Sequence, residues 1–164
     1  MRCAILTIST SLARGEGEDL SGAALANAAA AAGAEVTARA VVSDDAAVIE
    51  RWLRAQVTDG VELVLTTGGT GLTPDDVTPE ATLAVIERAV PGLAEAMRAE
   101  SLRYTPMSML SRAVAGVAGG SLIINFPGSP KAIAQLFPVV EPVLGHAVAT
   151  LHRQNGNREQ HPAG

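Results

Sequence analysis

Aromatic side chains and basic charge are both scarce in this chain, and each shortage excludes a class of protein. Phe, Trp and Tyr make up 2% of the 164 residues, so nucleic-acid bases would find no aromatic surface on which to stack. The formal net charge of −5 leaves no broad basic face that could neutralise many phosphates of DNA or RNA. We therefore expect no nucleic-acid partner, and a phosphorylated ligand needs a local binding site.

Cysteine, histidine and long apolar runs are scarce as well. Cys3 is the single cysteine, which excludes an internal disulfide, and the three histidines lack the spacing of zinc ligands. No run reaches about 18 uninterrupted apolar residues, and the short apolar stretch at the N-terminus does not have the pattern of a signal peptide. We expect a cytoplasmic protein without a membrane partner.

What the chain does contain is an alternation of strand and helix patterns. Short apolar runs predict strands at residues 2–8, 35–42 and 63–67. Apolar residues at helical spacing predict helices at 20–32, 45–59, 79–89 and 92–100, the second of them capped by Asp44. Runs at 113–118 and 121–126, joined by Gly119-Gly120, predict a hairpin. A last helix is predicted from 130 to about 151, with a break near Pro138 and Pro142 left open.

These elements predict a three-layer α/β/α sandwich with a mostly parallel mixed sheet. One domain covers residues 1–152, and the polar residues 153–164 are expected to form a disordered tail. In such a fold, ligands bind at the carboxyl ends of the strands. Polar and glycine residues gather in the loops that follow the strands ending at residues 8, 42, 67 and 126, while the connections at the opposite edge are plain. We therefore predict a cleft at that edge, with Asp44 near Asp76.

The segment 64–80 carries the strongest functional signal. Its strand ends at Thr67, and Gly68, Gly69 and Gly71 then allow positive φ angles and a close approach of backbone N–H groups to a ligand. Thr66, Thr67 and Thr70 add hydroxyl donors, and Thr78-Pro79 has the pattern of an N-cap followed by proline at the first helical position. The sequence predicts a phosphate site here. The alternative is a tight glycine loop with solvated turn residues.

Asp75 and Asp76 lie inside this predicted anion site. Carboxylates would repel a phosphate unless a cation stood between them, and Mg2+ is commonly shared between one or two carboxylates and substrate phosphates. A second helix N-terminus, with Ser129 as N-cap and Pro130 after it, is predicted to face the same cleft. It carries Lys131, the only lysine, which either binds phosphate or is a solvated first-turn residue.

Taken together and in order, several motifs resemble the molybdopterin-binding domain shared by molybdopterin adenylyltransferases and their relatives in molybdenum cofactor biosynthesis. The resemblance runs from the first strand to Leu151. The matching segments are DLSG (19–22), SDD (43–45), TTGGTG (66–71), DVTPEAT (76–82), PGL (91–93) with Met97, Arg98 and Ser101, LSR (110–112) and NFPGSP (125–130).

The resemblance implies transfer of AMP from Mg-ATP to the terminal phosphate of molybdopterin, with release of pyrophosphate. Asp76 and Asp44 would be the catalytic aspartates and would hold Mg2+. The implied partners are a small-molecule pterin and a nucleotide, further copies in a homotrimer, and a molybdenum-insertion protein. The implied substrate-binding residues are Thr67, Gly68, Gly69, Thr70, Gly71, Ser111, Arg112, Pro127, Gly128, Ser129 and Lys131. For Arg112 a structural ion pair is the alternative.

The chain departs from the family pattern at two positions. Thr10 stands where family members often carry an aspartate, and Asp75 precedes Asp76 where a basic or neutral residue is common. The first departure removes a contact to the metal or the pterin, and Asp75 is expected to point outward. Two other functions stay open. One is a protein that binds molybdopterin without catalysis. The other is a small nucleotide or phosphosugar hydrolase, which the segment Pro127-Gly128-Ser129-Pro130 disfavours.

Overall fold

The computed structural model describes residues 1–153, and the predicted tail lies almost wholly outside them. The described chain holds a six-stranded sheet of order β2-β1-β3-β6-β5-β4. Its strands are β1 (Arg2–Ile8), β2 (Glu35–Val42), β3 (Leu63–Thr67), β4 (Arg88–Ala89), β5 (Ala115–Ala118) and β6 (Ser121–Phe126). The strands β2, β1, β3 and β6 pair in parallel, while β5 runs antiparallel to both β6 and β4. The predicted mixed sheet and its hairpin are confirmed.

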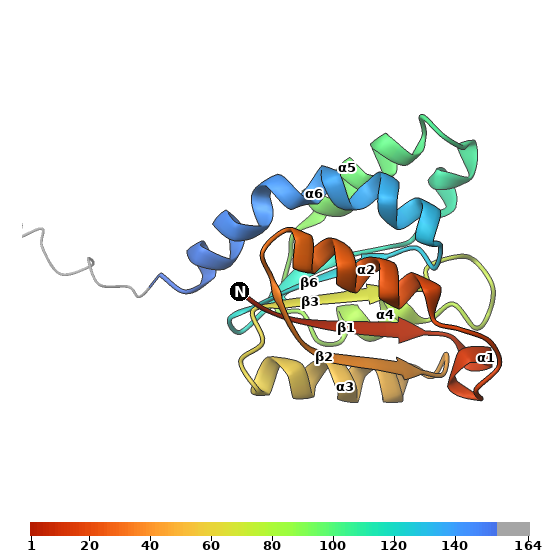
Figure 1. Cartoon of the computed structure of the whole chain (residues 1–164), viewed down its shortest axis with the longest axis horizontal. Coiled ribbons are helices and arrows are strands. Elements are labelled where there is room, and N and C mark those ends of the chain that lie inside the picture. Colours follow the sequence, from red (N-terminus) through yellow and green to blue (C-terminus); the bar gives the residue numbers. More distant parts are fainter. Residues whose placement is uncertain (154–164) are drawn as a thin grey trace, which may run out of the picture.

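Helices cover both faces of this sheet (Figure 1). One layer contains α2 (Leu20–Ala31), α5 (Pro91–Ser101) and α6 (Pro130–Leu151), and the other contains α3 (Ala46–Thr58) and α4 (Thr78–Leu83). A short helix α1 (Thr10–Ala13) follows β1, and a 3-10 helix η1 (Pro106–Leu110) follows α5. The three-layer sandwich is therefore confirmed.

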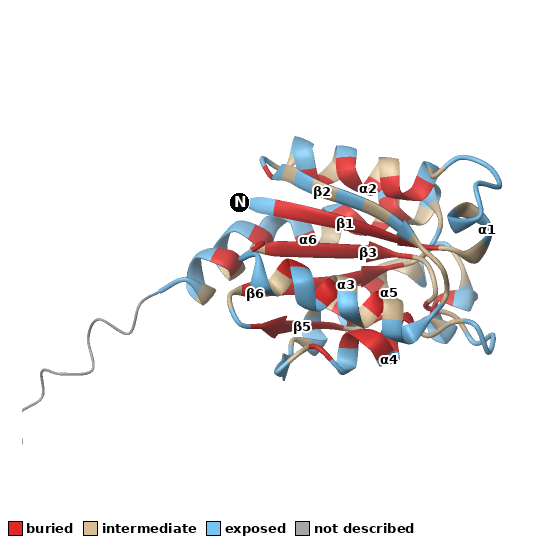
Figure 2. Cartoon of the chain, turned by 90° about the horizontal axis from the view of Figure 1, so that it is seen from below, coloured by how far each residue is buried: buried red, intermediate tan, exposed pale blue. Residues whose placement is uncertain are grey.

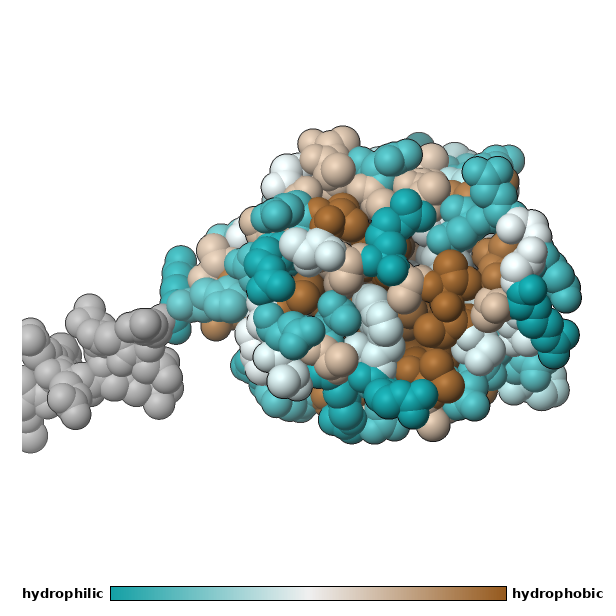
Figure 3. Space-filling model, turned by 60° about the horizontal axis from the view of Figure 1, so that its bottom comes forward, coloured by the Kyte–Doolittle hydropathy of each residue, from teal (hydrophilic) through white to brown (hydrophobic). Residues whose placement is uncertain are grey.

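The central strands separate two apolar cores, because alternate side chains of a strand point to opposite faces. In β1, Cys3 and Ile5 pack with α2, α5 and α6, whereas Ala4 and Leu6 pack with α3 and α4. The strands β1 and β3 are buried along almost their whole length (Figure 2). The outer surface is mixed, and on the face in Figure 3 hydrophilic side chains surround smaller apolar patches. Continuous burial of the central strands explains why their sequences are apolar throughout.

The helix α6 is continuous through Pro138 and Pro142 and does not break there. Both prolines are exposed, so water can hydrate the carbonyl groups that lose their helical N–H partners. By length and composition alone α6 could cross a membrane, with a mean hydropathy of 1.4. In the fold its apolar stripe, which includes Ile133, Leu136 and Phe137, belongs instead to the core beneath α2 and α5.

Two predictions from local sequence, the helix at 79–89 and the caps of two helices, differ from the structure. The predicted helix 79–89 is wrong beyond α4, because the N–H groups of Glu87 and Val90 donate to β5 at 2.8 Å each and draw the chain into the edge strand β4. The predicted caps are also displaced. Asp45, not Asp44, caps α3 by accepting from the N–H groups of its first turn. Thr78 is the first residue of α4 and caps nothing.

The buried thiol in β1 supplies a probe of folding. Burial raises the pKa of Cys3 to about 12. Since this pKa is raised on folding, the contribution of Cys3 to stability is complete below the pKa of an unfolded thiol, roughly 8.5, and is lost as pH rises toward the folded pKa. We predict that the native protein does not react with a disulfide reagent such as DTNB at pH 8, whereas urea-unfolded protein reacts at once. Rapid labelling of the native protein would contradict this.

Candidate functional site

The exits of neighbouring parallel strands meet at one edge of the sheet, as the sequence predicts. The N–H group of Ser9, after β1, donates to Val42 O at the end of β2 at 2.9 Å. The N–H group of Gly68, after β3, donates to Phe126 O at the end of β6 at 3.1 Å. Thr67 Oγ1 also donates to Pro127 O at 2.9 Å. These bonds join the exit of β1 to that of β2, and the exit of β3 to that of β6. We call the four exits together the rim of the site.

Gly68 and Gly69 are required by the geometry of this rim. Their φ angles are +97° and +65°, which L side chains rarely adopt. A Cβ at Gly68 would clash with Ile8 O, and one at Gly69 would clash with Thr78 Oγ1. A Cβ at Gly128 would lie 3.2 Å from the Cα of Gly68. The backbones of the two glycine loops therefore touch directly.

Buried hydrogen bonds hold the Gly-rich loop from beneath. Thr78 Oγ1 donates to Gly68 O at 2.9 Å, and the Thr78 N–H group donates to Gly69 O at 3.1 Å. Thr82 Oγ1 donates to Thr78 O at 2.8 Å, and it accepts from Asn125 Nδ2 at 3.0 Å. Thr78, Thr82 and Asn125 have 0% exposure. No pattern in the sequence pointed to this network, although Thr82 and Asn125 belong to two of its motifs.

Arg112 holds the same loop from the side. Its backbone N–H group donates to Thr70 O at 2.9 Å, and the Nε of its side chain donates to Gly71 O at 2.7 Å. Its Nη2 donates to Asp76 O and its Nη1 to the carboxylate of Glu80. Every nitrogen of the guanidinium thus has an acceptor in the protein. The geometry favours the structural alternative for Arg112 over direct contact with a phosphate.

Three backbone N–H groups of the Gly-rich loop are left without partners. Within residues 1–153, the N–H groups of Gly69, Thr70 and Gly71 have no protein acceptor. Beside them α6 begins at Pro130, and Ser129 caps it by accepting from the Ala132 N–H group at 3.3 Å. Unpaired amides next to the positive end of a 22-residue helix form an anion site. Lys131 is exposed in the first turn of that helix.

Two carboxylates lie on the rim, each held by a threonine through a single oxygen. Asp76 Oδ2 accepts from the N–H group and Oγ1 of Thr73 at 2.9 and 2.8 Å, and it lies 2.8 Å from where a Cβ of Gly71 would be. Asp44 Oδ2 accepts from the N–H group and Oγ1 of Thr10 at 2.8 Å each. Both Oδ1 atoms are without a protein partner among the described residues. Asp75 is exposed.

No group of three or more acidic, cysteine or histidine side chains comes together in the part of the chain that the structure describes. A cation here would take most of its ligands from water and from substrate phosphates, as Mg2+ commonly does. Thr10 stands where family members often carry an aspartate, and it stabilises the carboxylate of Asp44. Its hydroxyl donates a hydrogen bond to Asp44, whereas an aspartate at position 10 would repel Asp44.

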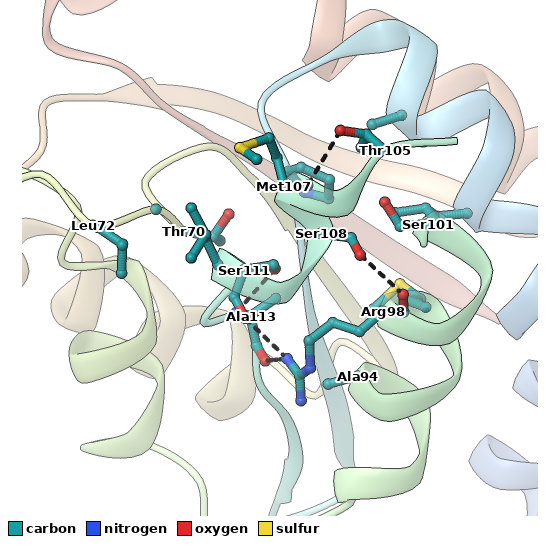
Figure 4. Close-up of a pocket in the computed structure, with 16 residues that line it drawn as sticks. Thr70, Leu72, Ala94, Arg98, Ser101, Thr105, Met107, Ser108, Ser111 and Ala113 are labelled. Carbon is teal, nitrogen blue, oxygen red and sulfur yellow. Dashed lines mark hydrogen bonds between the residues drawn. The ribbon is translucent and has the colours of Figure 1, made fainter. Parts of the chain in front are cut away.

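A cavity of about 380 Å³ opens beside the Gly-rich loop (Figure 4). The predicted site residues Thr70, Gly71, Ser111 and Pro127 line one side of it. The opposite wall comes from α5 and η1, with Met97, Arg98, Ser101, Thr105, Met107, Ser108 and Leu110. This wall was missed as part of the site, although Met97, Arg98, Ser101 and Leu110 stand in the motifs that carry the family resemblance. Asp44 and Lys131 are not among the lining residues.

Gly68 offers a direct test of the rim. We predict that Gly68→Ala lowers the free energy of unfolding by about 1–3 kcal/mol, because alanine is strained at this φ and its Cβ meets Ile8 O. Gly92→Ala is the matched control, since Gly92 lies in α5 with open space around its Cβ position. That change should be neutral or stabilise by at most about 1 kcal/mol. Urea denaturation measures both, and equal stabilities would contradict the prediction.

The ion pair at the side of the loop predicts a pH dependence. The hydrogen bond from Arg112 holds the pKa of Glu80 below its ordinary value. Because this pKa is lowered, Glu80 contributes stability above the ordinary carboxyl range and loses it as pH falls through the folded pKa. We predict that Arg112→Gln raises the Glu80 pKa, measured by NMR of its side-chain carboxyl carbon. Arg103→Gln, which removes the exposed pair with Glu100, should leave the Glu80 titration unchanged.

Comparison with known proteins agrees with this geometry. Residues 4–146 match the family described as "Probable molybdopterin binding domain". The chain is 46% identical over 109 residues to the molybdopterin adenylyltransferase of Haemophilus influenzae and 44% identical over 109 residues to that of Escherichia coli. Each match covers 66% of this chain, and 55% and 56% of the respective relative. The chain thus spans about half the length of these curated relatives.

Solved structures match over more of the chain. The molybdopterin biosynthesis enzyme MoaB of Thermus thermophilus is 47% identical, covers 92% of this chain with 95% of its own, and has a TM-score of 0.86. A structure of MogA is 38% identical, covers 92% of this chain with 99% of its own, and has a TM-score of 0.88. Because the family model matches residues 4–146 and these structures match 92% of the chain, this chain belongs to the molybdopterin-binding domain family.

Proposed function

We propose that this protein is a molybdopterin adenylyltransferase, which transfers AMP from Mg-ATP to the terminal phosphate of molybdopterin. The observation that carries the proposal is the set of unpaired amides at Gly69, Thr70 and Gly71 directly beside Asp76. A phosphate held by those amides lies within reach of a carboxylate that can share a metal with it. The relatives whose names state this activity support the same reaction.

In the proposed reaction, a terminal phosphate oxygen of molybdopterin attacks the α-phosphorus of ATP. A new P–O bond forms, the bond from the α-phosphorus to the bridging oxygen breaks, and pyrophosphate leaves with that electron pair. The attacking phosphate is already anionic at neutral pH, so no general base is required. The protein's task is to align the two phosphates and to neutralise charge that shifts onto the leaving group.

The residues of the rim have separate tasks in this proposal. The amides of Gly69, Thr70 and Gly71 and the N-terminus of α6 at Ser129 hold phosphate oxygens. Lys131 is exposed in the first turn of that helix and would add positive charge there as the pyrophosphate leaves. The side chains of Thr67 and Arg112 keep the loop in shape, because their hydrogen bonds already go to protein carbonyl groups.

Asp76 and Asp44 fit a magnesium site by the chemistry of their free oxygens. Each carboxylate has one oxygen occupied by a threonine and Oδ1 available, and hard oxygen ligands are those that Mg2+ prefers. Bound Mg2+ would neutralise phosphate charge and orient the α-phosphate. The hydrogen bonds to Thr10 and Thr73 hold the two carboxylates ready without consuming both oxygens.

The remaining expectations belong to the same proposal. A homotrimer and transfer of the adenylated product to a molybdenum-insertion protein follow from the family resemblance, and cytoplasmic location follows from the apolar pattern of the sequence. Exposed apolar side chains in η1 and in the turn before it, such as Met109 and Tyr104 at 68% and 54%, are suited to a subunit contact. The second candidate is a carrier that binds molybdopterin without transfer, which Thr10 supports because it removes one acidic ligand.

Pyrophosphate release from Mg-ATP, with and without molybdopterin, tests the activity. We predict release that depends on molybdopterin and that falls at least about a hundredfold in Asp76→Asn. The variant should still fold, because an asparagine oxygen can accept from Thr73. Asp75→Asn is the matched control and should retain activity, since Asp75 is exposed. Molybdopterin binding without any pyrophosphate release would establish the carrier instead.

A further inference from the structure

We propose that a groove at the far edge of the sheet binds a small amphipathic anion, a carboxylate attached to an alkyl chain. The groove has a volume of about 470 Å³ and lies between the edge strand β4, the first turn of α5 and the C-terminal half of α6. This volume falls in the range of about 300–1,000 Å³ that is usual for small-molecule sites. The proposal does not depend on adenylyl transfer.

The groove is separate from the substrate site. The site lies where α6 begins at Pro130, whereas the residues of α6 that line the groove run from Val143 to Leu151. His152 Nε2, directly after α6, lies 3.9 Å from Glu62 Oε1, directly before β3. This is the amino end of the parallel strands, opposite to the rim (Figure 1). No described residue lines both the groove and the cavity beside the Gly-rich loop.

Most of the groove is apolar, and part of that apolar surface is open to solvent. Val117 and Leu122 belong to the core at 5% and 1% exposure, so they form the base of the groove. Val143 is 46% exposed, and Ala147 and Leu151 are half-buried. An alkyl chain in the groove would remove this surface from water, and the gain would grow with each CH2 group that it buries.

The polar groups of the groove fit the charge of a carboxylate. Arg88 and His146 line it, and none of the described lining residues is an aspartate or glutamate. The guanidinium of Arg88 is exposed and forms no ion pair or side-chain hydrogen bond within residues 1–153. It is permanently charged and can hold a carboxylate through two parallel N–H bonds. The His146 ring also lacks a partner in the described chain, and either neutral tautomer carries an N–H donor.

Charge distinguishes this ligand from a second copy of the chain. If two copies met groove to groove, the same residues would lie on both sides of the contact. Arg88 would then face a groove without a carboxylate, and burying a charge that has no partner opposes binding. An alkyl carboxylate supplies the missing acceptor and the apolar surface together.

Chain length and charge of the ligand test the two parts of the proposal separately. In calorimetric titrations below the micelle-forming concentrations, we expect the affinity to rise about threefold to fourfold per added CH2 from octanoate to decanoate to dodecanoate, the factor for one buried CH2. Decanoate should bind at least about tenfold more tightly than decanol, which lacks the charge. An affinity that does not depend on chain length, or equal affinities of the acid and the alcohol, would overturn the proposal.

Arg88→Gln tests the assigned cation. This variant should bind decanoate at least about tenfold more weakly and decanol with unchanged affinity, because only the charged ligand loses a partner. Arg51→Gln on α3 removes the same charge from another exposed position and is the matched control. It should bind both ligands like the wild type. A decanoate affinity that is unchanged in Arg88→Gln would contradict the assignment.

Filling the groove tests its position. Ala147→Phe should weaken decanoate binding at least about tenfold, whereas Ala149→Phe, at an exposed position of α6 outside the groove, should leave it unchanged. If Ala147→Phe does not fold by circular dichroism, Val143→Asp replaces it, because Val143 lies on the surface and a carboxylate there would repel the ligand. Equal affinities in the variant and in the control would overturn the proposal.

Two further measurements distinguish the groove from other sites and occupants. In methyl NMR spectra, decanoate should shift the signals of Leu151 and leave those of Leu110, which lines the substrate cavity, unchanged. The reverse result would place the ligand in that cavity and overturn the proposal. Sedimentation should give the same assembly state for the wild type and Ala147→Phe. If the substitution dissociates an assembly, the groove is a subunit contact and the proposal is wrong.

Discussion

The site depends on one steric constraint, which is the direct contact of backbones where the central strands end. Gly68 lies against the carbonyl group of Ile8, and Gly128 lies against Gly68. The strands β1, β3 and β6 are neighbours in the sheet, so their exit loops meet without intervening side chains. The next amides of the Gly-rich loop, at Gly69, Thr70 and Gly71, have no acceptor among residues 1–153. The same constraint that excludes a Cβ therefore produces the anion site.

Two independent sets of hydrogen bonds keep that loop in place. The set beneath it is uncharged and runs from Asn125 through Thr82 and Thr78 to Gly68 O, and its three side chains are fully buried. The set at its side is charged and partly exposed, and it consists of Arg112 with its carbonyl acceptors and Glu80. Acid weakens only the second set, because protonation of Glu80 leaves the buried bonds unchanged. Because both sets fix the loop, its unpaired N–H groups stay available to a phosphate and do not bond to other acceptors in the protein.

Local patterns predicted what depends on local physics. The apolar runs of β1 and β3, the hairpin at Gly119-Gly120 and the Ser129 cap of α6 all follow from residue type and spacing. Helix 79–89 failed because pairing of Glu87 and Val90 with β5 is a contact between distant segments. The task of Arg112 was left open for the same reason, since its acceptors lie up to 41 residues away. The wall of the cavity needed α5 and η1 to be placed opposite the glycine loop, which periodicity does not encode.

The two departures from the family pattern affect the charge of the site unequally. At Thr10 a neutral hydroxyl replaces a carboxylate and donates to Asp44, so the site contains one negative charge less and the remaining carboxylate is held in place. Asp75 adds a negative charge, but it is exposed, and water and salt screen an exposed charge within about 8–10 Å. The net effect is weaker repulsion of the incoming phosphates and one ligand fewer for a cation. Binding of anionic substrates is favoured by that exchange, and the demand on Asp76 and on the substrate phosphates to hold Mg2+ becomes greater.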